Sequence, residues 1–458
     1  MNTISKDTVI IGSGLTGLTA AFYAKKKRTD FLVLEKSDKH GGVIQTVSEG
    51  DFLYEEGPNT GVIGNEYVVE LFDEISDIAV PKIPGENVKK RYILKNGKWH
   101  ALPSGLISGI TTPLFTIRDK FRILGEPFRS RGKDPEENLI DMVKRRLGNS
   151  YLNYAVDPFI GGVYAGDPKL LIPRYALPKL YNLEQTYGSF IRGAIKKKFE
   201  PKTELQKRAS RKVFSFPGGL TGLTSAIFKK SGTENFLFGM KDIRVEKNTE
   251  GYDVHATGND GQVRISAKNI ITTTGAYELP QLLPFVPEQD IKKISQLHYT
   301  RVIEVAVGLN KWEGIPLDGF GGLIPYIENR DLLGILFMSS LFRNRAPENG
   351  ALLSVFIGGV RKEYLYDLTD DEVIQLLEKE FRLLMGLGKF TPDLLSISRH
   401  RWAIPQYGID SPERFQTVMS IQEKNPGLLI GGNLRNGIGI ADRIQQGRNL
   451  IEDPSATL

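Results

Sequence analysis

The feature that most constrains the fold is a glycine-rich turn close to the N-terminus. The pattern Gly12-x-Gly14-x-x-Gly17 follows the apolar run Thr8–Ile11 and opens an Ala- and Leu-rich stretch that reaches Lys27. The apolar run predicts a buried strand, and the stretch after the glycines predicts a helix. A glycine turn between a strand and a helix commonly starts a parallel βαβ unit, so we expect an α/β fold.

Each part of this turn suits a bound dinucleotide. The first glycine permits the tight turn, the second lets the backbone approach a pyrophosphate, and the third lets the helix pack closely on the strand. The helix N-terminus adds free N–H groups and a favourable dipole. The next predicted strand, Phe31–Leu34, ends in Glu35, whose carboxylate can accept hydrogen bonds from ribose hydroxyls. A glycine-rich turn in an unrelated α/β protein is the alternative.

Glycines further along the chain favour FAD over NAD. The pairs Gly41-Gly42 and Gly57-Pro58 follow the second strand, where flavoproteins similar to amine oxidases bring backbone to the flavin end of FAD. Near the C-terminus, the predicted strand Leu428–Ile430 ends in glycines, and a glycine-rich run over residues 436–442 opens a helix. The dipole of that helix can stabilise negative charge on a reduced flavin ring. Glycine-rich turns at both ends of the chain therefore predict one extended FAD.

Composition limits the remaining chemistry. The chain has no cysteine, which excludes a thioether link, so we expect FAD to be bound non-covalently. Its five histidines lack metal-ligand spacing, and no metal site is expected. A net charge of +6 over 458 residues indicates a mildly basic surface rather than a nucleic-acid-binding protein. The N-terminus does not read as a signal peptide and no apolar run is long enough to span a bilayer, so we expect a cytoplasmic protein.

Local signals predict several further elements. Asn96-Gly97 predicts the turn of a hairpin over Arg91–Lys98. Asp134-Pro135-Glu136-Glu137 predicts a helix start, with the helix ending near Gly148. A capping box at Thr369–Glu372 predicts a helix to about Gly386, and the last helix is expected from Gly439 or Ala441 to Glu452. The predicted strands of the second half are Ile243–Val245, Tyr252–Ala256, Val263–Ile265, Ile270–Thr273, Tyr299–Leu309, Leu332–Met338 and Leu352–Phe356, with a turn at Asn259-Asp260-Gly261.

Longer motifs resemble the protoporphyrinogen oxidase family of flavin enzymes, which is similar to the flavin amine oxidases. The matches follow the order of the family along almost the whole chain. The matching segments are Val156–Pro168, Pro178–Leu180, Leu183-Glu184, Tyr187–Gly193, Phe214–Leu220, Arg401–Tyr407 and Asn433–Gly447.

The resemblance implies a three-part α/β (α+β) architecture. A discontinuous, Rossmann-like FAD-binding domain is expected over residues 1–90, 211–280 and 396–458. A helical, membrane-facing and substrate-contacting region is expected over 91–210, and a sheet-containing substrate-binding domain over 281–395. The implied reaction removes six electrons from a porphyrinogen in three flavin cycles, with dioxygen as acceptor and hydrogen peroxide as product. Hydride passes from the porphyrinogen to flavin N5 in each cycle.

Cofactor contacts can be carried over position by position. The first of these residues form the phosphate loop or lie by the ribose. The others lie near the isoalloxazine, contact the adenine side or match further flavin positions near the C-terminus. The implied cofactor-binding residues are Gly12, Gly14, Leu15, Thr16, Gly17, Glu35, Lys36, Gly41, Gly42, Gly57, Pro58, Asn59, Thr60, Val245, Trp402, Asn433, Ile438, Gly439 and Ile440.

The implied substrate pocket combines flat apolar walls with one cation. Phe320, Gly321, Leu323 and Phe342 match positions that contact the tetrapyrrole, as a large apolar macrocycle requires. Arg91 matches an arginine that binds a propionate, and a guanidinium offers paired donors to a carboxylate. Core packing for the apolar residues and a surface role for Arg91 are the alternatives. The chain departs from members that carry arginine where Asn59 and Ile107 stand here.

Several assignments remain open. No catalytic acid or base can be named, since Asp157 and Asp167 are equally explained as capping and turn residues. The apolar and basic stretch Leu106–Phe128 could lie on an anionic membrane at the inner face of the cell membrane. Homodimer formation and delivery of product to a downstream haem-pathway enzyme are also open.

Three other functions compete with protoporphyrinogen oxidation. The first is a related flavin oxidase acting on coproporphyrinogen III, which would require more basic residues in the pocket. The second is a flavin amine oxidase, which the porphyrinogen oxidase motifs disfavour. The third is a flavoprotein that binds porphyrin without catalysis, which reduction of its flavin by a porphyrinogen would exclude.

Overall fold

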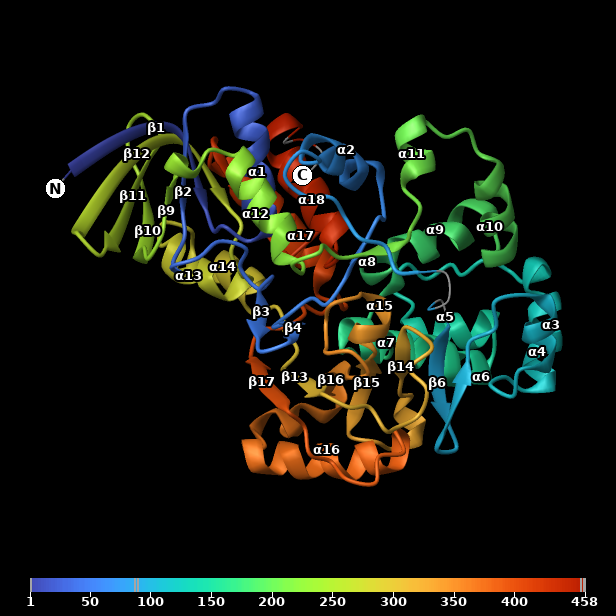
Figure 1. The fold of residues 1–458 in the computed structure, drawn as a ribbon. Coiled ribbons are helices and arrows are strands. Elements are labelled where there is room, and N and C mark those ends of the chain that lie inside the picture. Colours follow the sequence, from blue (N-terminus) through green and yellow to red (C-terminus); the bar gives the residue numbers. More distant parts are fainter. Residues whose placement is uncertain (1, 86–87, 89, 454, 456–458) are drawn as a thin grey trace.

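The computed structural model describes residues 2–85, 88, 90–453 and 455. Two large sheets and a group of helices form the molecule (Figure 1). The first sheet lies at the left of the view with the N-terminus and has helices such as α1, α12 and α18 beside it. The second sheet lies below with helix α16 beneath it, and helices such as α4, α6 and α10 lie to the right.

The first sheet carries the glycine-rich turn and is mostly parallel at its centre. Its strand order is β10-β11-β12-β1-β2-β9, and β18 pairs with the end of β12. β1 is parallel to both β12 and β2, whereas β10, β11 and β12 form an antiparallel meander. The strands are β1 (Asn2–Ile11), β2 (Phe31–Leu34), β9 (Phe236–Leu237), β10 (Lys241–Lys247), β11 (Tyr252–Gly258), β12 (Gly261–Thr272) and β18 (Leu428–Ile430).

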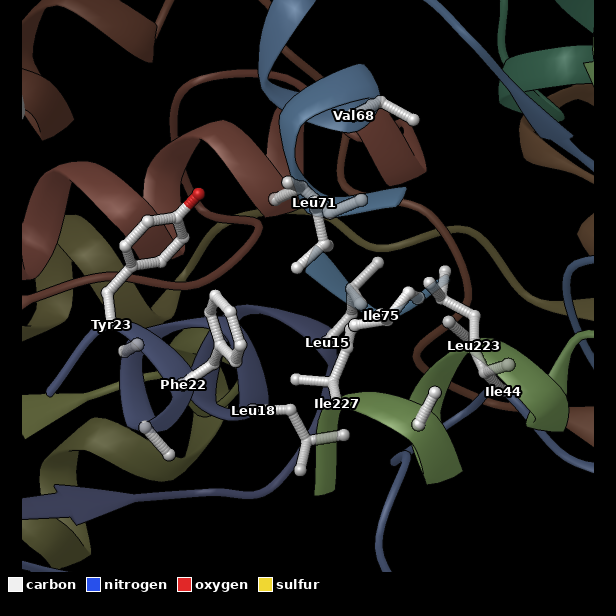
Figure 2. Close-up of a cluster of buried hydrophobic side chains, with 14 of the residues drawn as sticks. Leu15, Leu18, Phe22, Tyr23, Ile44, Val68, Leu71, Ile75, Leu223 and Ile227 are labelled. Atoms are coloured by element: carbon white, nitrogen blue, oxygen red, sulfur yellow. The ribbon is translucent and has the colours of Figure 1, made fainter. Parts of the chain in front are cut away.

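Both faces of this sheet are covered, as a parallel sheet requires. Ile10 points to a core formed with helices α1, α2, α12 and α18, whereas Val9 and Ile11 point to a second core on the opposite face. Leu15, Leu18 and other side chains of α1 pack against α2 and α12 in the first core (Figure 2). The helices around the sheet are α1 (Leu15–Lys26), α2 (Glu66–Glu74), α12 (Thr221–Lys230), α13 (Leu279–Leu282), α14 (Glu288–Ser295), α17 (Ser411–Lys424) and α18 (Ile440–Glu452).

The second sheet has the order β17-β13-β16-β15-β14-β6-β7. Helix α16 covers one face, onto which Ile303, Val305 and Val307 of β13 point. The other face carries Ala306 and lies against Phe52 and Tyr54 of the hairpin β3–β4. The elements are β6 (Arg91–Lys95), β7 (Lys98–Ala101), β13 (Val302–Leu309), β14 (Gly321–Leu323), β15 (Leu332–Leu336), α15 (Met338–Leu341), β16 (Ala351–Gly358), α16 (Asp370–Leu384) and β17 (Leu394–His400). The small hairpins are β3 (Thr46–Glu49) with β4 (Phe52–Glu55), and β5 (Gly61–Val62) with β8 (Val213–Phe214).

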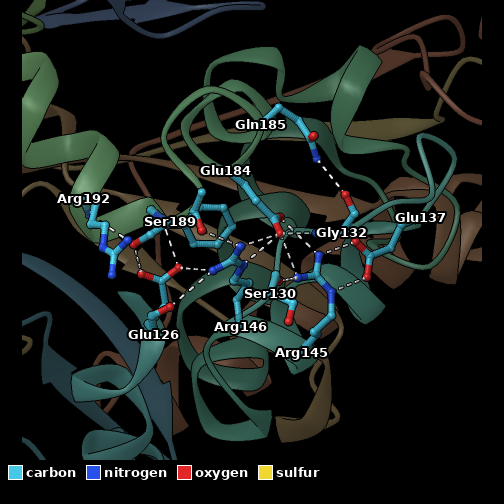
Figure 3. Close-up of polar contacts among 12 residues, drawn as sticks. Glu126, Ser130, Gly132, Glu137, Arg145, Arg146, Glu184, Gln185, Ser189 and Arg192 are labelled. Carbon is cyan, nitrogen blue, oxygen red and sulfur yellow. Dashed lines mark hydrogen bonds and ion pairs between the residues drawn. The ribbon is translucent and has the colours of Figure 1, made fainter. Parts of the chain in front are cut away.

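Helices α3 to α11 form the helical region, which is held by a buried ion network (Figure 3). Arg146 donates to both Glu126 and Glu184, and all three side chains are fully or almost fully buried. Arg145 adds a second guanidinium to Glu184. The helices are α3 (Leu106–Thr111), α4 (Ile117–Leu124), α5 (Leu139–Arg146), α6 (Asn149–Tyr151), α7 (Asp157–Tyr164), α8 (Pro173–Ala176), α9 (Pro178–Tyr187), α10 (Phe190–Phe199) and α11 (Glu204–Arg208). Among the described residues, no helix combines the length and apolar character needed to cross a bilayer.

Most predicted elements are confirmed. β2 occupies the predicted range, and the hairpin β6–β7 turns at Asn96-Gly97 with positive φ at both residues. The capping box of α16 is present: the Thr369 hydroxyl accepts from the Glu372 N–H, and the Glu372 carboxylate accepts from the Thr369 N–H. Helix α18 begins at Ile440 and ends at Glu452.

Three predictions were wrong in detail. The helix expected from Asp134 begins at Leu139 after an Asn138 cap, because Asp134 instead closes a turn by accepting from the Glu136 N–H. The two strands predicted between 263 and 273 are one long strand, β12, since both halves pair with β1. The strand predicted over Leu332–Met338 ends at Leu336, and Met338 starts α15.

Candidate functional site

The β1–α1 turn has the close backbone geometry that the glycine pattern predicts. Gly12 has a φ of +102°, which favours glycine. A Cβ at position 17 would lie 1.9 Å from the Gly12 carbonyl oxygen, so helix and strand approach as closely as backbone allows. A Cβ at position 14, in contrast, would meet no atom within 4 Å. Gly14 therefore caps α1 beside free space, where a phosphate could approach the helix N-terminus.

Leu15 and Thr16 lie within this turn, and both side chains are buried. Leu15 belongs to the core beneath α1. Any contact of these two residues with a phosphate would therefore use their backbone N–H groups, which lie in the first turn of the helix.

Glu35 is tied to the same turn. Its Oε2 accepts hydrogen bonds from the Ser13 N–H at 2.7 Å and the Ser13 hydroxyl at 2.9 Å, and Oε1 accepts from the Ser37 N–H. A carboxylate has about four acceptor sites, so capacity for a ribose hydroxyl remains. Lys36 points elsewhere and forms an ion pair with Glu278. The structure therefore joins Glu35 to the turn and gives Lys36 a protein partner.

Gly41 and Gly42 pack directly on the turn. The Gly41 N–H donates to the Ser13 carbonyl at 2.9 Å, and a Cβ on Gly42 would lie 3.1 Å from the Gly14 Cα. Gly57 follows, and a Cβ there would lie 2.2 Å from the Val43 carbonyl oxygen. Backbone thus leads from Gly14 to the segment 57–60, where Pro58 and Thr60 are half-buried and Asn59 is buried.

Two tyrosines that sequence reasoning missed link the C-terminal glycine segment to Trp402. Asn433 Oδ1 accepts from the Tyr299 hydroxyl at 2.9 Å. Trp402 stacks on Tyr277 with ring centroids 4.6 Å apart and meets the edge of Tyr299. The rings of Tyr277 and Tyr299 carry no motif of their own in the sequence. They connect two predicted cofactor positions, Trp402 and Asn433.

The start of α18 has an open backbone. Gly439 is the N-cap and is exposed, and its N–H donates to the Asp442 carboxylate at 3.0 Å. Ile438 packs against the cluster around Tyr407, and Ile440 packs against the core beneath α1. A helix N-terminus in this setting can stabilise a nearby negative charge.

Val245 is less directly placed than the other predicted cofactor residues. It lies on the edge strand β10 with its side chain fully buried in the core. The preceding residues lie beside the ribose-side carboxylate instead: Gly239 donates to the Ser37 carbonyl, and Met240 donates to the Glu35 carbonyl at 2.9 Å. Residues 239 and 240 are thus the part of this segment that adjoins Glu35.

The predicted substrate residues fall into two groups. The Arg91 guanidinium lies 5.3 Å from the centre of the Phe320 ring, in cation–π geometry, and Phe320 and Phe342 share one apolar cluster. Leu323 instead packs against Gly162 of α7, where a Cβ would lie 2.3 Å from its side chain. Gly321 is required by its φ of +137° and by the close Ile335 carbonyl, irrespective of any ligand.

A buried polar cluster lies between the segment 57–60 and the second sheet. Asn59 Nδ2 donates to Glu304 Oε1 at 2.6 Å, and Asn59 Oδ1 accepts from the Ser354 hydroxyl at 2.6 Å. His400 lies on the other side of Glu304, with Nε2 3.8 Å from Oε2. Sequence reasoning missed both Glu304 and His400. The available signal was one acid in the apolar run Val302–Leu309.

The two acids of the helical signature are structural. Asp157 accepts from the Tyr326 N–H at 2.8 Å and pairs with Arg361, which ties α7 to the second sheet. Asp167 closes a turn by accepting from the Lys169 N–H.

The arrangement fits an extended dinucleotide that reaches the second sheet. The open side of Gly14 offers a phosphate position, Glu35 lies beside it, and the backbone of 41–42 leads toward Asn59. Asn59 donates a hydrogen bond to Glu304, on one face of the second sheet. Ala306 lies on the same face and belongs to the apolar cluster that contains Phe320 and Phe342. A redox ring held near Asn59 would therefore face an apolar cluster with a cation, Arg91, at its margin.

Comparison with known proteins agrees with this geometry. Residues 15–434 match the family described as flavin containing amine oxidoreductase. Protoporphyrinogen oxidase 1, chloroplastic, of Arabidopsis thaliana is 31% identical over 96% of this chain and 86% of its own length. Coproporphyrinogen III oxidase of Bacillus subtilis (strain 168) is 26% identical over 98% of this chain and 97% of its own length.

A solved structure shares the whole fold. The putative protoporphyrinogen oxidase from Exiguobacterium sp. 255-15 superposes with a TM-score of 0.80 at 21% identity, covering 100% of this chain and 99% of that one. The family match covers residues 15–434, which include the helical signature, and the Arabidopsis relative covers 96% of this chain. This chain therefore belongs to the flavin containing amine oxidoreductase family, in the group that includes the protoporphyrinogen oxidases.

Proposed function

We propose that this chain is an oxidase that uses non-covalent FAD to convert protoporphyrinogen IX to protoporphyrin IX, with dioxygen as the electron acceptor. The observation that carries the proposal is the direct contact between the segment 57–60 and the second sheet. Asn59 bonds to Glu304 and Ser354 of the sheet face that also carries Phe342. A flavin ring and a flat apolar substrate would meet at this contact.

The cofactor supplies hydride acceptance and reaction with dioxygen when it is bound. The protein's part is to hold it. We propose that the backbone of Gly12–Gly17 and the α1 N-terminus bind the pyrophosphate, and that Glu35 binds a ribose. We also propose that the start of α18 faces the pyrimidine, where its dipole would favour the reduced ring.

The substrate side requires flat walls and an anion site. Phe320 and Phe342 are buried or half-buried aromatic rings in one cluster, which suits a tetrapyrrole. Arg91 lies at the exposed start of β6 and stacks on Phe320 without an acidic partner among the described side chains. Its donors are therefore available to a propionate carboxylate.

The number of available cations favours protoporphyrinogen, with two propionates, over coproporphyrinogen, with four. Two positions at which some relatives carry arginine are Asn59, which is buried and fully bonded, and Ile107, which is exposed to solvent. Neither can bind a carboxylate by charge. Among the described residues, Arg91 is a cation beside this cluster that has no acidic partner, whereas Arg345, 5.7 Å from the centre of the Phe342 ring, is paired with Glu55.

The test is a comparison of two substrates in air. Purified protein should be yellow and should convert non-fluorescent protoporphyrinogen IX to fluorescent protoporphyrin IX. The ratio of initial rate to substrate concentration should be higher for protoporphyrinogen IX than for coproporphyrinogen III. A higher value with coproporphyrinogen III would assign the alternative substrate, and no conversion of either would reject the proposal.

We further propose that the helical region rests on a membrane surface. Helices α3 and α4 and the turn after them expose a set of large apolar side chains, which soluble surfaces rarely group together. These side chains are Ile107, Ile110, Ile117, Phe121, Leu124 and Phe128. Arg118, Arg131 and Lys133 lie nearby in sequence and would favour anionic lipid. An apolar product could leave on this side.

Vesicle binding tests this surface. The protein should cosediment with vesicles that contain anionic lipid, and Phe121→Asp should reduce binding without loss of flavin. The matched control is Tyr364→Asp, since Tyr364 is a similarly exposed aromatic on the second-sheet side of the molecule. Equal binding by Phe121→Asp and wild type would reject the membrane surface.

We propose the domain division over residues 1–90, 91–210, 211–280, 281–395 and 396–458, and the fold changes one boundary of it. The hairpin β6–β7, within residues 91–210, is part of the second sheet. Residues 91–101 would therefore belong with the substrate-binding part rather than with the helical region.

A further inference from the structure

Glu304 is a buried acid in a strand that is otherwise apolar. Strand β13 reads Val-Ile-Glu-Val-Ala-Val-Gly-Leu, and every residue in it is buried. Glu304 is only 3% exposed, and it lies on the same face as Ala306, which belongs to the cluster that contains Phe342. An isolated carboxylate in such surroundings is expensive to bury, so the side chain needs an explanation beyond packing.

No strong cation neutralises this carboxyl group. In the part of the chain that the structure describes, its ion-pair contact is with His400 at 3.8 Å, and no lysine or arginine pairs with it. Burial raises the pKa of Glu304 well above its usual value; the Asn59 hydrogen bond opposes the shift, and the charges of Glu55 and Glu56 add to it. Burial therefore favours the protonated form of Glu304.

His400 continues the path from Glu304 toward solvent. Its Nε2 faces Glu304 and has no hydrogen-bond partner among the described residues. Burial lowers the pKa of His400, and the nearby charge of Glu56 partly opposes this shift, so the ring is neutral at rest. Its side chain is 24% exposed, whereas that of Glu304 is 4% exposed. Glu304 is thus the buried member of the pair, and His400 is the member that reaches solvent.

Other titratable groups surround the pair without replacing it. Glu55 approaches from the end of β4, but it pairs with Arg345 at 2.9 Å. Glu56 follows it, and Tyr54 of β4 lies in the cluster on the same face of the second sheet. Arg345 is thereby engaged by Glu55 and the Leu53 carbonyl, and it does not neutralise Glu304.

We infer that Glu304 and His400 carry the proton that the porphyrinogen must release in each oxidation cycle. This inference rests on the proposed function. As hydride leaves a meso carbon, the substrate also loses a proton from a pyrrole nitrogen. That N–H bond breaks as a new O–H bond forms on the Glu304 carboxyl, while the carboxyl's original proton moves to His400 Nε2. His400 then releases the proton to solvent, and the pair returns to its starting state. Over the three cycles, tautomerisation of the last meso CH2 returns one proton to nitrogen, so that the porphyrin keeps two N–H groups.

The relay explains features of the Glu304 site that packing and folding stability alone would not require. A protonated carboxyl is both donor and acceptor, so it can pass a proton without ever carrying a full buried charge. Asn59 fixes Oε1 through a 2.6 Å bond and leaves Oε2 toward His400. Because Asn59 also lies in the segment proposed to border the flavin, the carboxyl stands beside the reacting centre.

The experiment is anaerobic mixing of the flavin-loaded protein with protoporphyrinogen IX over a range of pH. Glu304→Gln keeps the shape and the Asn59 bond but cannot relay a proton. We expect it to retain flavin and substrate affinity, to slow flavin reduction by about 10²- to 10⁴-fold and to lose the pH dependence seen in wild type. His400→Gln should slow reduction in the same direction.

The matched control is Glu380→Gln. Glu380 is also a buried acid whose pKa is raised by burial, but it lies on α16, on the opposite face of the second sheet. Its variant should reduce flavin as fast as wild type. Wild-type rates and pH profiles in both Glu304→Gln and His400→Gln would overturn the relay. A wild-type protein whose flavin is not reduced would refute the proposed function as well.

Discussion

Two buried polar clusters of this protein differ in how their charges are matched. In the helical region, Arg146 is completely buried and donates to Glu126 and Glu184 (Figure 3). In the cluster beside segment 57–60, Glu304 is almost as buried but meets an amide and a neutral histidine. The first cluster balances each charge with an opposite one, and the second avoids charge by keeping its proton.

The difference separates a structural role from a chemical one. Burial acts to raise the pKa of Glu184, but hydrogen bonds from Arg145, Arg146 and Gly132 together lower it, so this acid stays ionised. Glu304 shifts in the opposite direction because it lacks such donors. A fully satisfied network holds helices together, whereas an acid with a perturbed pKa near a ligand position can exchange protons.

The largest expected effect comes from breaking the balanced cluster. Arg146→Ala leaves Glu126 and Glu184 buried with one guanidinium fewer, which should cost about 3–5 kcal/mol in the free energy of unfolding. Urea denaturation measures this loss. Arg208→Ala removes an exposed arginine that pairs with Asp73 and should leave the midpoint unchanged. Equal midpoints for the two variants would contradict a stabilising role for the network.

A smaller effect is expected at the margin of the second cluster. Arg91→Ala removes a charged donor for a propionate, worth about 1.5–3 kcal/mol, so the apparent KM for protoporphyrinogen should rise roughly tenfold or more. Flavin affinity should not change. Arg399→Ala, on β17 of the same sheet, serves as the control because Arg399 pairs with Asp370. An unchanged KM in Arg91→Ala would remove Arg91 from the substrate site.

The smallest effect concerns stability and pH. Because the folded-state pKa of Glu304 lies above its unfolded value of about 4.3, the native state binds the extra proton, and wild-type stability falls as pH rises from the unfolded pKa through the folded one. Glu304→Gln lacks this titration. Its melting temperature relative to wild type should therefore increase between about pH 5 and about pH 8. A difference that does not vary with pH would show that Glu304 is not protonated in the fold.

Sequence patterns predicted the elements whose signals are local. The β1–α1 turn, the Asn96-Gly97 turn and the Thr369 capping box depend on neighbouring residues, and all three are present. The helix start predicted at Asp134 was wrong because Asp134 and Asn138 are competing N-cap candidates. Asn138 caps the helix, and Glu137, the acid expected to complete a cap at Asp134, instead accepts from Arg145. Local preference could not decide between them without the tertiary contact.

The parts of the site that depend on long-range pairing could not be predicted. Glu304 and His400 meet because β13 lies between β16 and β17, and no local pattern specifies this strand order. The contact of Asn59 with Glu304 likewise joins a loop residue to a strand that lies far away in the sequence. Motif resemblance named Asn59 as a cofactor residue but not its partners. Trp402 was named as a cofactor residue, but Tyr277 and Tyr299, which contact its ring, were missed for the same reason.

The most direct test of the central claim is the colour of the flavin on anaerobic addition of protoporphyrinogen IX. The protein should be isolated with bound FAD, its yellow absorbance should bleach within the turnover time, and admission of air should restore it with formation of fluorescent porphyrin. Protein that neither carries nor takes up flavin, or bound flavin that stays oxidised in the presence of the porphyrinogen, would contradict the account.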